Sequence, residues 1–500
     1  MCRPTAKNVA SWADSAVRLA IVHHHLHPGG VTRIIEHAVS ALRSYDIDIV
    51  ILSGEPPDRA WGVPVRVVDT LAYEEQRAAA SPVQLADDLQ AAARNALGSL
   101  PDLWHVHNHS LGKNLALPGA LQALADAGQR LLLQLHDFAE DGRPLNYRRL
   151  RSVVGEGDGA RLVQCLYPQA GQVHYAVLNG RDLKLLGAAG IPPARLHALA
   201  NPVSLQAGTT ASEDLRSRQQ RLWLYPTRAI RRKNLGEFLL WAALAEPGDQ
   251  FATTLGPSNP AERPRYERWR ELAGAVSLPV RFELGANPAH RFEDILSSAY
   301  AMVTTSIAEG FGMAFLEPWL VGRAVTGRNL VEITAEFTEA GVALPHLYTR
   351  LDVPVEWIGN QVLEQKAQQG LQRSWDAYGR SLQADDLSRT LAAWIHNSQV
   401  DFGRLDEALQ EQVIRTVTGS ADARRQLQPL RLPDPGENSE RTSENRAVIL
   451  ANFGLEQYGS RLLGIYQQIM DSPVEPLESL PGEAVLDQFL AAERLYLLRS

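Results

Sequence analysis

The 500-residue chain is poor in cysteine, in long apolar runs and in positive charge, and each scarcity excludes a class of protein. Its two cysteines, Cys2 and Cys165, cannot form a disulfide framework, so a reducing compartment is expected. No apolar run approaches the roughly 18 residues of a membrane span. The first residues carry Arg3, Lys7 and Asp14 without an apolar core, which is not the pattern of a signal peptide. The sequence therefore predicts a soluble cytoplasmic protein with no integral membrane segment.

The charge balance argues against a further class of proteins, those that bind nucleic acids. A net charge of −8 and a pI near 6.0 argue against general nucleic-acid binding, although they leave room for a local basic site that holds a phosphate. Apolar residues make up 45% of the chain and charged residues 21%, as in ordinary globular proteins. The length suggests about two to four domains.

Apolar strands and amphipathic helices alternate in two series along the chain. The first series runs over 18–199 and includes a short apolar run at 162–165, which we expect to be a strand. Polar residues at 204–220 lack periodicity and predict a linker, and the second series follows over 222–321. Residues 445–469 predict a final amphipathic helix. This order is typical of parallel α/β domains.

One stretch of the second series organises the functional argument. Tyr300–Thr304 predicts a buried parallel strand, and Met313–Val321 predicts the helix that follows it. Glu309 then lies at the carboxyl end of the strand, and Gly310 and Gly312 open the helix. Ligands of open α/β sheets bind at this edge, where glycines let backbone N–H groups approach them closely.

The spacing of Glu309 and Glu317 discriminates between chemistries. Glu317 lies two helical turns farther along, or roughly 10 Å. The two carboxyl groups of a retaining glycosidase are about 5 Å apart and those of an inverting one about 6.5–9.5 Å apart. The pair is too widely spaced for the first and doubtful for the second. We interpret the two glutamates as contacts to one long ligand; from this stretch alone, ordinary helix glutamates remain an equal alternative.

A basic turn follows the first strand of the second series. Arg228 ends that strand, and Lys233 and Asn234 open the next helix. Fixed cations beside a helix N-terminus suit a diphosphate and would stabilise charge on a leaving phosphate. A solvated basic turn is the alternative.

Two motifs of the first series follow predicted strands, at the edge of the sheet where ligands are expected to bind. Gly29 and Gly30 begin a helix whose free N–H groups suit a phosphate, although a bare Gly-Gly is also a common tight turn. His136 ends a continuous apolar strand, where it could donate to an anionic oxygen or a sugar hydroxyl. An ordinary loop histidine is the alternative.

Further histidines invite a metal-site interpretation, which we reject for the first group. Successive side chains of a strand point to opposite faces, so we expect that four histidines cannot converge on one ion: His23, His24, His25 and His27. His105, His107 and His109 share one face, and we favour active-site lining over a metal for them.

Taken together and in this order, these motifs resemble the family 4 retaining glycosyltransferases of the GT-B fold. The matching residues are Gly29-Gly30, His136-Asp137, Arg228 with Lys233-Asn234, and Glu309-Gly310-Phe311-Gly312 with Glu317. The last pair looks like the E-x7-E signature of the family. The resemblance covers most of residues 17–330 and the final helix.

The resemblance implies two Rossmann-like domains facing a cleft, with a C-terminal helix that crosses back to the first domain. Residues 1–204 would form the acceptor domain and 205–432 the nucleotide-sugar donor domain. Residues 433–500 would form a linker and C-terminal helices that pack back on the first domain.

The resemblance also implies retaining transfer of a hexose from a nucleotide diphosphate sugar to a hydroxyl acceptor, without a metal or other cofactor. A soluble small molecule or saccharide is the expected acceptor. Glu317 would hold the ribose, Arg228 and Lys233 the diphosphate, and Glu309 the hydroxyls of the donor sugar. The implied roles are catalytic for His136, Glu309, Arg228 and Lys233, and donor-binding for Gly29, Gly30, Asn234, Gly310, Phe311, Gly312 and Glu317.

Three departures from the family pattern concern the donor domain. Pro318 follows Glu317 and is expected to kink a continuous helix. Gly327-Arg328-Asn329 stands where many members carry Gly-Gly, and residues 331–430 resemble no known segment. Two alternatives stay open: a GT-B sugar phosphorylase or synthase, and a catalytically silent member that binds a sugar nucleotide.

Overall fold

The computed structural model describes residues 16–74, 80–204, 220–427, 431–436 and 439–500. These residues divide into two compact units. The first holds the described residues up to Leu178 with Asp182–Pro202 and Leu455–Leu486, and the second holds Asn179–Arg181, Val203–Gly454 and Asp487–Ser500. The expected linker at 204–220 lies almost entirely outside the described residues.

A parallel sheet of seven strands forms the centre of the first unit, in the order β3-β2-β1-β4-β5-β6-β7. The chain builds β1 to β3 toward one edge and then returns to add β4 beside β1, so the order reverses between β1 and β4. Every residue of β4, β5 and β6 is buried, as expected for a sheet covered on both faces. The strands are β1 (Val17–His23), β2 (Ile47–Ser53), β3 (Val65–Val67), β4 (Leu103–His107), β5 (Leu131–Leu135), β6 (Val173–Val177) and β7 (Leu196–Ala198).

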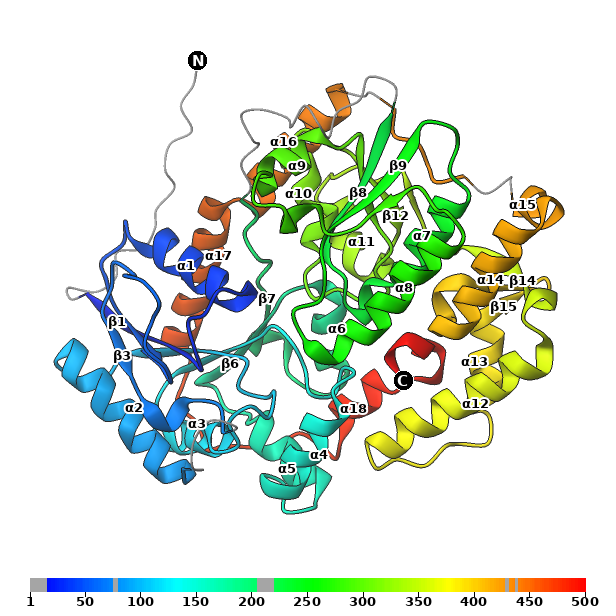
Figure 1. Ribbon diagram of the computed structural model, residues 1–500. Coiled ribbons are helices and arrows are strands. Elements are labelled where there is room, and N and C mark those ends of the chain that lie inside the picture. Colours follow the sequence, from blue (N-terminus) through cyan, green and yellow to red (C-terminus); the bar gives the residue numbers. More distant parts are fainter. Residues whose placement is uncertain (1–15, 75–79, 205–219, 428–430, 437–438) are drawn as a thin grey trace. The chain divides into compact units, whose positions relative to one another are not determined.

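Helices connect these strands, and a late helix joins them from the far end of the chain. Figure 1 shows α17 (Leu455–Asp471) lying beside α1 (Gly30–Leu42), and the hydroxyl of Tyr466 on α17 bonds His105 of β4 at 2.8 Å. The chain therefore returns to the first unit, as the resemblance implied. The other helices are α2 (Pro82–Leu97), α3 (Leu117–Asp126), α4 (Pro144–Val153), α5 (Gly159–Leu166), α6 (Gly180–Ala188) and α18 (Ala484–Phe489).

A second parallel sheet, of six strands, forms the centre of the second unit in the order β10-β9-β8-β11-β12-β13. Its order reverses between β8 and β11. The strands are β8 (Arg221–Arg228), β9 (Asp249–Leu255), β10 (Val280–Arg281), β11 (Ala301–Thr304), β12 (Val325–Arg328) and β13 (Leu347–Tyr348). Around them lie α7 (Leu235–Ala243), α8 (Arg263–Ala275), α9 (Phe292–Ser298), α10 (Glu317–Leu320), α11 (Val331–Glu339) and α16 (Ser439–Phe453). The predicted fold class, with two Rossmann-like domains, is confirmed.

The segment that resembled nothing known forms an annex to the second unit. Its three short antiparallel strands are β14 (Asp352–Pro354), β16 (Gln399–Asp401) and β15 (Ile395–His396). Its helices are α12 (Asn360–Ala377), α13 (Asp386–Trp394), α14 (Glu407–Gly419) and α15 (Ala421–Leu427). The annex shares one apolar core with the sheet, because Trp394 and Val413 belong to the same buried cluster as Phe238 of α7.

The C-terminal boundaries differ from the expected ones. The helix expected over 445–469 is two helices, α16 and α17, which end and begin on either side of Gly454. The first of these belongs to the second unit, as do Asp487–Ser500, so only Leu455–Leu486 packs on the first unit.

The expected strand at 162–165 is wrong, because these residues lie in helix α5. Leu162, Val163 and Leu166 are buried at helical spacing, and the side chain of Asp158 caps the helix by accepting from Ala160 N–H at 2.8 Å. A short apolar run does not distinguish a buried strand from one face of a short helix.

The expected helix over Met313–Val321 is broken, and the break explains how Pro318 is accommodated. A 3₁₀ turn covers Met313–Phe315, and α10 starts anew at Glu317. Pro318 therefore lies in the first helical turn, where its missing N–H group would have had no partner. The proline sets the start of a helix, and the expected kink does not arise.

No helix in the described ranges is both long enough and apolar enough to cross a membrane.

Candidate functional site

Lys233 and Glu309 form an ion pair at the reversal point of the second sheet. Lys233 ends the 3₁₀ turn Arg231–Lys233 that follows β8, and Glu309 lies in the loop after β11. Their side chains are in direct contact and only 14% and 9% exposed. Because β8 and β11 are the neighbours between which the strand order reverses, the pair lies where open α/β sheets bind ligands.

The surroundings keep the carboxyl group of Glu309 ionised. Burial raises its pKa, but the positive charges of Lys233 and Arg232 outweigh burial, so the pKa lies below its ordinary value. A fixed anion and a fixed cation thus lie side by side at this edge of the sheet. Such a pair can accept from sugar hydroxyls with one member and neutralise phosphate oxygens with the other.

Side chains of β8 and of the loop after β11 hold the turn that carries Lys233. The hydroxyl groups of Tyr225 and Thr305 each donate to the carbonyl oxygen of Lys233 at 3.0 Å. Asn234 has the left-handed backbone conformation, with φ of 51°, which asparagine tolerates better than most residues. These contacts fix the direction in which the chain leaves the turn.

The side chain of Asn234 points into the unit, away from any ligand. It is 1% exposed, its Nδ2 donates to Glu237 at 2.7 Å, and its Oδ1 accepts from Gln410 at 2.8 Å. Asn234 was expected to bind the donor; in this structure only its backbone could do so. Its side chain instead ties the turn to α7 and α14.

Replacing Asn234 tests whether this tie sets the position of Lys233. Asn234→Ala loses both side-chain bonds and places a β-carbon in the left-handed region, at a cost of about 1–2 kcal/mol for the conformation alone. We expect weaker nucleotide binding by the alanine variant, and an intermediate effect for Asn234→Gly, which removes only the bonds. Isothermal titration with nucleoside diphosphates measures both. Equal affinities for the two variants and the wild type would show that Lys233 does not depend on this tie.

Arg328, the last residue of β12, forms a fully buried ion triad. Its Nη2 lies 2.7 Å from Oε2 of Glu237 and 2.7 Å from Oδ1 of Asp401, and its side chain is 1% exposed. A Cβ on Gly403 would lie only 2.6 Å from the guanidinium carbon, so the annex backbone approaches Arg328 closely. Burial raises the pKa of Glu237, whereas the charge of Arg328 outweighs burial at Asp401 and lowers its pKa. Since Glu237 also accepts from Asn234, the triad supports the same turn.

The glycine loop after Glu309 has little room for side chains. Gly312 has φ of 94°, and a Cβ there would lie 2.7 Å from Cγ2 of Ile333. Phe311 is 3% exposed and packs against the ring of Phe337 at 5.4 Å, so only its backbone could reach a donor. Gly310 precedes it in the same loop, and Glu317 begins α10, partly exposed.

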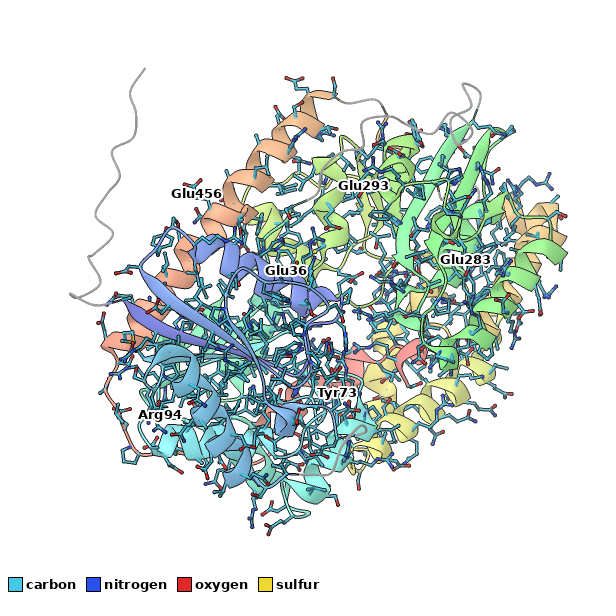
Figure 2. The ribbon with its side chains drawn as sticks, turned by 60° about the vertical axis from the view of Figure 1, so that its left-hand side comes forward. Glu36, Tyr73, Arg94, Glu283, Glu293 and Glu456 are labelled. Carbon is cyan, nitrogen blue, oxygen red and sulfur yellow. The ribbon has the colours of Figure 1, made fainter. Side chains whose placement is uncertain are left out.

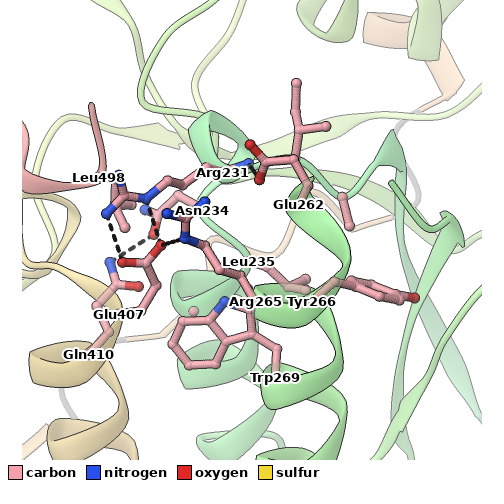
Figure 3. A pocket seen from close by; sticks show the side chains of 13 residues that line it. Arg231, Asn234, Leu235, Glu262, Arg265, Tyr266, Trp269, Glu407, Gln410 and Leu498 are labelled. Carbon is pink, nitrogen blue, oxygen red and sulfur yellow. Dashed lines mark hydrogen bonds and ion pairs between the residues drawn. The ribbon is translucent and has the colours of Figure 1, made fainter. Parts of the chain in front are cut away.

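The arginines of the basic turn differ in their side-chain partners. Arg228 ends β8 and is exposed, and its side chain forms no hydrogen bond or ion pair with another described residue. Arg231 instead bonds Glu407 of α14 at 2.6 and 2.9 Å, and Figure 3 shows this pair beside the small pocket behind the turn. That pocket has a volume of about 20 Å³, enough for one water rather than for a nucleotide.

In the first unit, the predicted residues lie at the ends of β1 and β5. Gly29 precedes α1 with an extended backbone, and no atom lies within 4 Å of a Cβ built on Gly30. The approach to the N-terminus of α1 is therefore open on this unit's own surface. His136 follows β5, is 7% exposed, and its backbone N–H donates to Oδ1 of Asn108 at 2.8 Å.

The sequence did not reveal how far the histidines converge. The rings of His23 and His107 lie 6.2 Å apart at the reversal between β1 and β4, and Nδ1 of His107 shares a hydrogen with Nε2 of His136 at 2.9 Å. Strand alternation does not apply to His24, His25 and His27, because only His23 belongs to β1 and the other three lie in a loop. There, His24 and His25 pack on the ring of Tyr73, which Figure 2 labels.

The fully buried histidines of this unit are neutral. Burial lowers the pKa of His24, His105 and His109 to about 4 and that of His136 to about 3. Neutral imidazoles can both donate and accept hydrogen bonds, as sugar hydroxyls require. Among the described residues, no group of three or more His, Cys, Asp or Glu side chains could hold a metal ion.

The neutral histidines make the stability of the first unit depend on pH. The unfolded chain binds their protons near pH 6.5 and the folded unit only near pH 4, so stability falls as pH decreases between these values. Each fully buried histidine contributes up to about 1.4 kcal/mol per pH unit. We expect hydrogen exchange, corrected for its intrinsic rate, to speed up more in peptides of the first unit than of the second between pH 7 and 5. Equal changes in both units would contradict this account.

Comparisons with known proteins agree with this architecture. No family model matches the chain. Mannosylglucosyl-3-phosphoglycerate synthase of Petrotoga mobilis is 26% identical over 329 residues, which are 60% of this chain. The match covers only 62% of the length of that relative.

Solved structures extend the likeness over nearly the whole chain. Anabaena HepE in complex with UDP-glucose matches with a TM-score of 0.53 and 13% identity, over 90% of this chain and 99% of that one. Sucrose-phosphate synthase of Thermosynechococcus elongatus matches with a TM-score of 0.53 and 16% identity, over 90% and 98%. At such identities the likeness shows the fold. The chain thus has the GT-B fold of these proteins, and its similarity to the Petrotoga synthase supports the group 1 glycosyltransferases as its family.

Proposed function

We propose that the protein transfers a hexose from a nucleotide diphosphate sugar to a hydroxyl acceptor, with retention of the anomeric configuration. The observation that carries the proposal is the Lys233–Glu309 pair at the β8/β11 reversal, with the exposed Arg228 at the end of the same strand. This is one anion and two cations on the ligand-binding edge of a parallel sheet.

The chemistry of the donor assigns the roles. Lys233 and Arg228 neutralise the diphosphate, and its charge grows as the bond to the sugar breaks, so both contacts strengthen in the transition state. Glu309 accepts from the sugar hydroxyls, together with the backbone of Gly310, Phe311 and Gly312, and Glu317 accepts from the ribose hydroxyls. With Lys233 and Arg228 both on the diphosphate, the proposed mechanism needs no metal.

The first unit supplies the acceptor side of the reaction. His136 bonds a hydroxyl group near the reacting carbon through Nδ1, because its Nε2 is engaged with Nδ1 of His107. The free N–H groups of Gly29 and Gly30 favour negative charge near α1. The low cysteine content fits a reducing compartment, and on that ground we place the enzyme in the cytoplasm.

The name of the Petrotoga relative supplies a first pair of substrates. Its product carries a mannosyl group on a glucosyl-3-phosphoglycerate, so an activated mannose and glucosyl-3-phosphoglycerate are the pair to test before other sugars.

The test is the release of nucleoside diphosphate from a panel of UDP-, GDP- and ADP-hexoses, with and without acceptors. We expect release from one base class, increased by an acceptor, and NMR of the product should show retention. Release of sugar phosphate that depends on orthophosphate would favour the phosphorylase alternative. Binding of a nucleotide sugar without any turnover would favour the silent member.

A further inference from the structure

Arg231 stands two residues before Lys233 in the basic turn, but its side chain extends toward the annex. Its Nε and Nη2 donate to the two carboxylate oxygens of Glu407 at 2.6 and 2.9 Å, and the two side chains are 23% and 17% exposed. Figure 3 shows this bidentate pair behind the turn. The backbone oxygens of Leu497 and Ser500 accept further hydrogen bonds from Arg231 at 3.4 and 3.2 Å. Its guanidinium group is therefore already engaged by the protein.

One face of helix α14 in the annex contacts the turn at two points. Glu407 bonds Arg231, and Gln410, three residues later on the same face, donates to Oδ1 of Asn234 at 2.8 Å. Arg231 and Asn234 lie on either side of Lys233 in the chain. The annex thus holds the backbone of the turn before and after this lysine, and removal of the Arg231 contact leaves the second one in place.

The same turn also bonds the loop that carries Glu309. The backbone N–H of Ile307 donates to the carbonyl oxygen of Arg232 at 3.0 Å, and Nη1 of Arg232 donates to the carbonyl oxygen of Ala308 at 3.4 Å. Lys233 then pairs with Glu309 itself. A displacement of the turn would therefore move Lys233 relative to Glu309, at the edge of the sheet where the diphosphate is expected.

We propose that Arg231 is a positioning residue, which fixes the direction of Lys233 through Glu407 of the annex and does not contact the nucleotide itself. The inference rests on the proposed function, because it concerns the lysine that holds the leaving diphosphate. It also assigns a role to part of a segment that resembles no known one, since α14 supports the donor turn. A bidentate pair fixes direction as well as distance, and a misplacement of about 1 Å can be costly in rate.

The inference is tested with Arg231→Gln and Glu407→Gln, which remove the pair from either side. Each is expected to lower kcat/KM for the donor by about tenfold, with the loss divided between kcat and KM as for Lys233. The double variant should be no worse than either single one, because both remove the same contact. Arg231→Lys keeps the charge without the bidentate geometry and should resemble Arg231→Gln. As a control, Arg268→Gln removes a pair with Glu411 of the same helix and should stay within about twofold.

The Lys233→Ala background separates positioning from a general loss of stability. Arg231→Gln should have no further effect there on the affinity for nucleoside diphosphate, because the side chain that it positions is gone. A change that only lowered the stability of the unit would reduce kcat without changing KM, and would do so in both backgrounds. Affinity is measured by isothermal titration, which needs no turnover and therefore also applies to a catalytically silent protein.

Three results would overturn the inference while the wild type still binds and transfers. Glu407→Gln could keep or raise the affinity while Arg231→Gln lowers it, which would show that Arg231 contacts the nucleotide directly. The effect of Arg231→Gln could persist unchanged in Lys233→Ala, or both single variants could stay within twofold of the wild type. Failure of the proposed function looks different, because the wild type itself would then bind no nucleotide or nucleotide sugar, and the inference would fall with it.

Discussion

Replacing Lys233 with alanine is expected to slow hexose transfer by about 10²–10³-fold, because losing one preorganised contact to a developing charge typically costs that much. Part of the loss should appear in kcat, since the diphosphate gains charge as the sugar leaves, and part in KM, because Lys233 also contacts the charge that the bound donor already carries. The rate is measured as release of nucleoside diphosphate with donor and acceptor at saturation. Unchanged kcat would show that Lys233 does not face the leaving group.

Two controls separate this effect from simple loss of charge. Arg268→Ala removes a cation from an exposed ion pair on α8 with Glu411 and should leave the rate within about twofold. Lys233→Ala also leaves the carboxylate of Glu309 without its partner, so the double variant Lys233→Ala/Glu309→Gln is informative. If the single variant failed only because of this stranded charge, the double variant would recover activity. We expect no recovery.

Replacing Arg328 with methionine is expected to lower the free energy of unfolding of the second unit by about 3–5 kcal/mol, the usual cost of leaving a buried charge without its partner. The variant strands Glu237 and Asp401, whose side chains are 0% and 3% exposed. Urea unfolding followed by tryptophan fluorescence is a suitable measurement, because seven of the ten tryptophans belong to this unit.

The pH dependence of this loss gives a second signature. Without Arg328, the two buried carboxyl groups take up protons more readily in the folded unit than in the unfolded chain. The difference from wild type should therefore be larger at pH 8 than at pH 5. The exposed Arg415→Met, which breaks a helical pair with Glu411, should cost less than about 1 kcal/mol. A similarly small loss for Arg328→Met would show that the triad does not support the unit.

A triple variant in which all three charges are removed, here called the neutral triad, tests more strictly whether the stranded charges cause the loss of stability. Replacing Arg328 with methionine together with Glu237→Gln and Asp401→Asn removes the stranded charges, so much of the lost stability should return. Glu237 also accepts from Asn234, however, and glutamine has only one side-chain oxygen that can accept. We therefore expect the neutral triad to recover stability more fully than nucleotide affinity.

The sequence could predict the two strand ends that carry Lys233 and Glu309, because each follows an apolar run. Lys233 and Glu309 lie 76 residues apart, yet each stands just beyond a strand with clear buried character. Parallel alternation and the reversal rule then bring the two strand ends together. This inference needs only patterns that a single chain displays.

The supports of the site could not be predicted in the same way. Arg328 meets Glu237 and Asp401 across 91 and 73 residues, and no periodicity links those positions. Asn234 looked like a ligand contact because it follows Lys233, but the left-handed backbone turns its side chain inward. The direction of a side chain in a turn depends on backbone angles that sequence patterns do not specify.

The histidines show a third kind of limit. Strand alternation applies to His23 but not to the residues after it, since β1 ends there. Strand alternation was therefore applied to three histidines that lie beyond the end of the strand. The break at Glu317 is similar, because Pro318 is compatible with a kinked helix or a new start, and the sequence does not decide between them.

The central claim is that the second unit binds a nucleotide diphosphate sugar through Lys233 beside Glu309. The most direct test is a thermal-shift panel of nucleotides and nucleotide sugars, with wild type beside Lys233→Ala. A ligand at 100 times its dissociation constant adds about 2.7 kcal/mol of stability, which such a panel detects. We expect one base class to shift the wild type strongly and the variant weakly. A flat panel, or equal shifts in both proteins, would contradict the account.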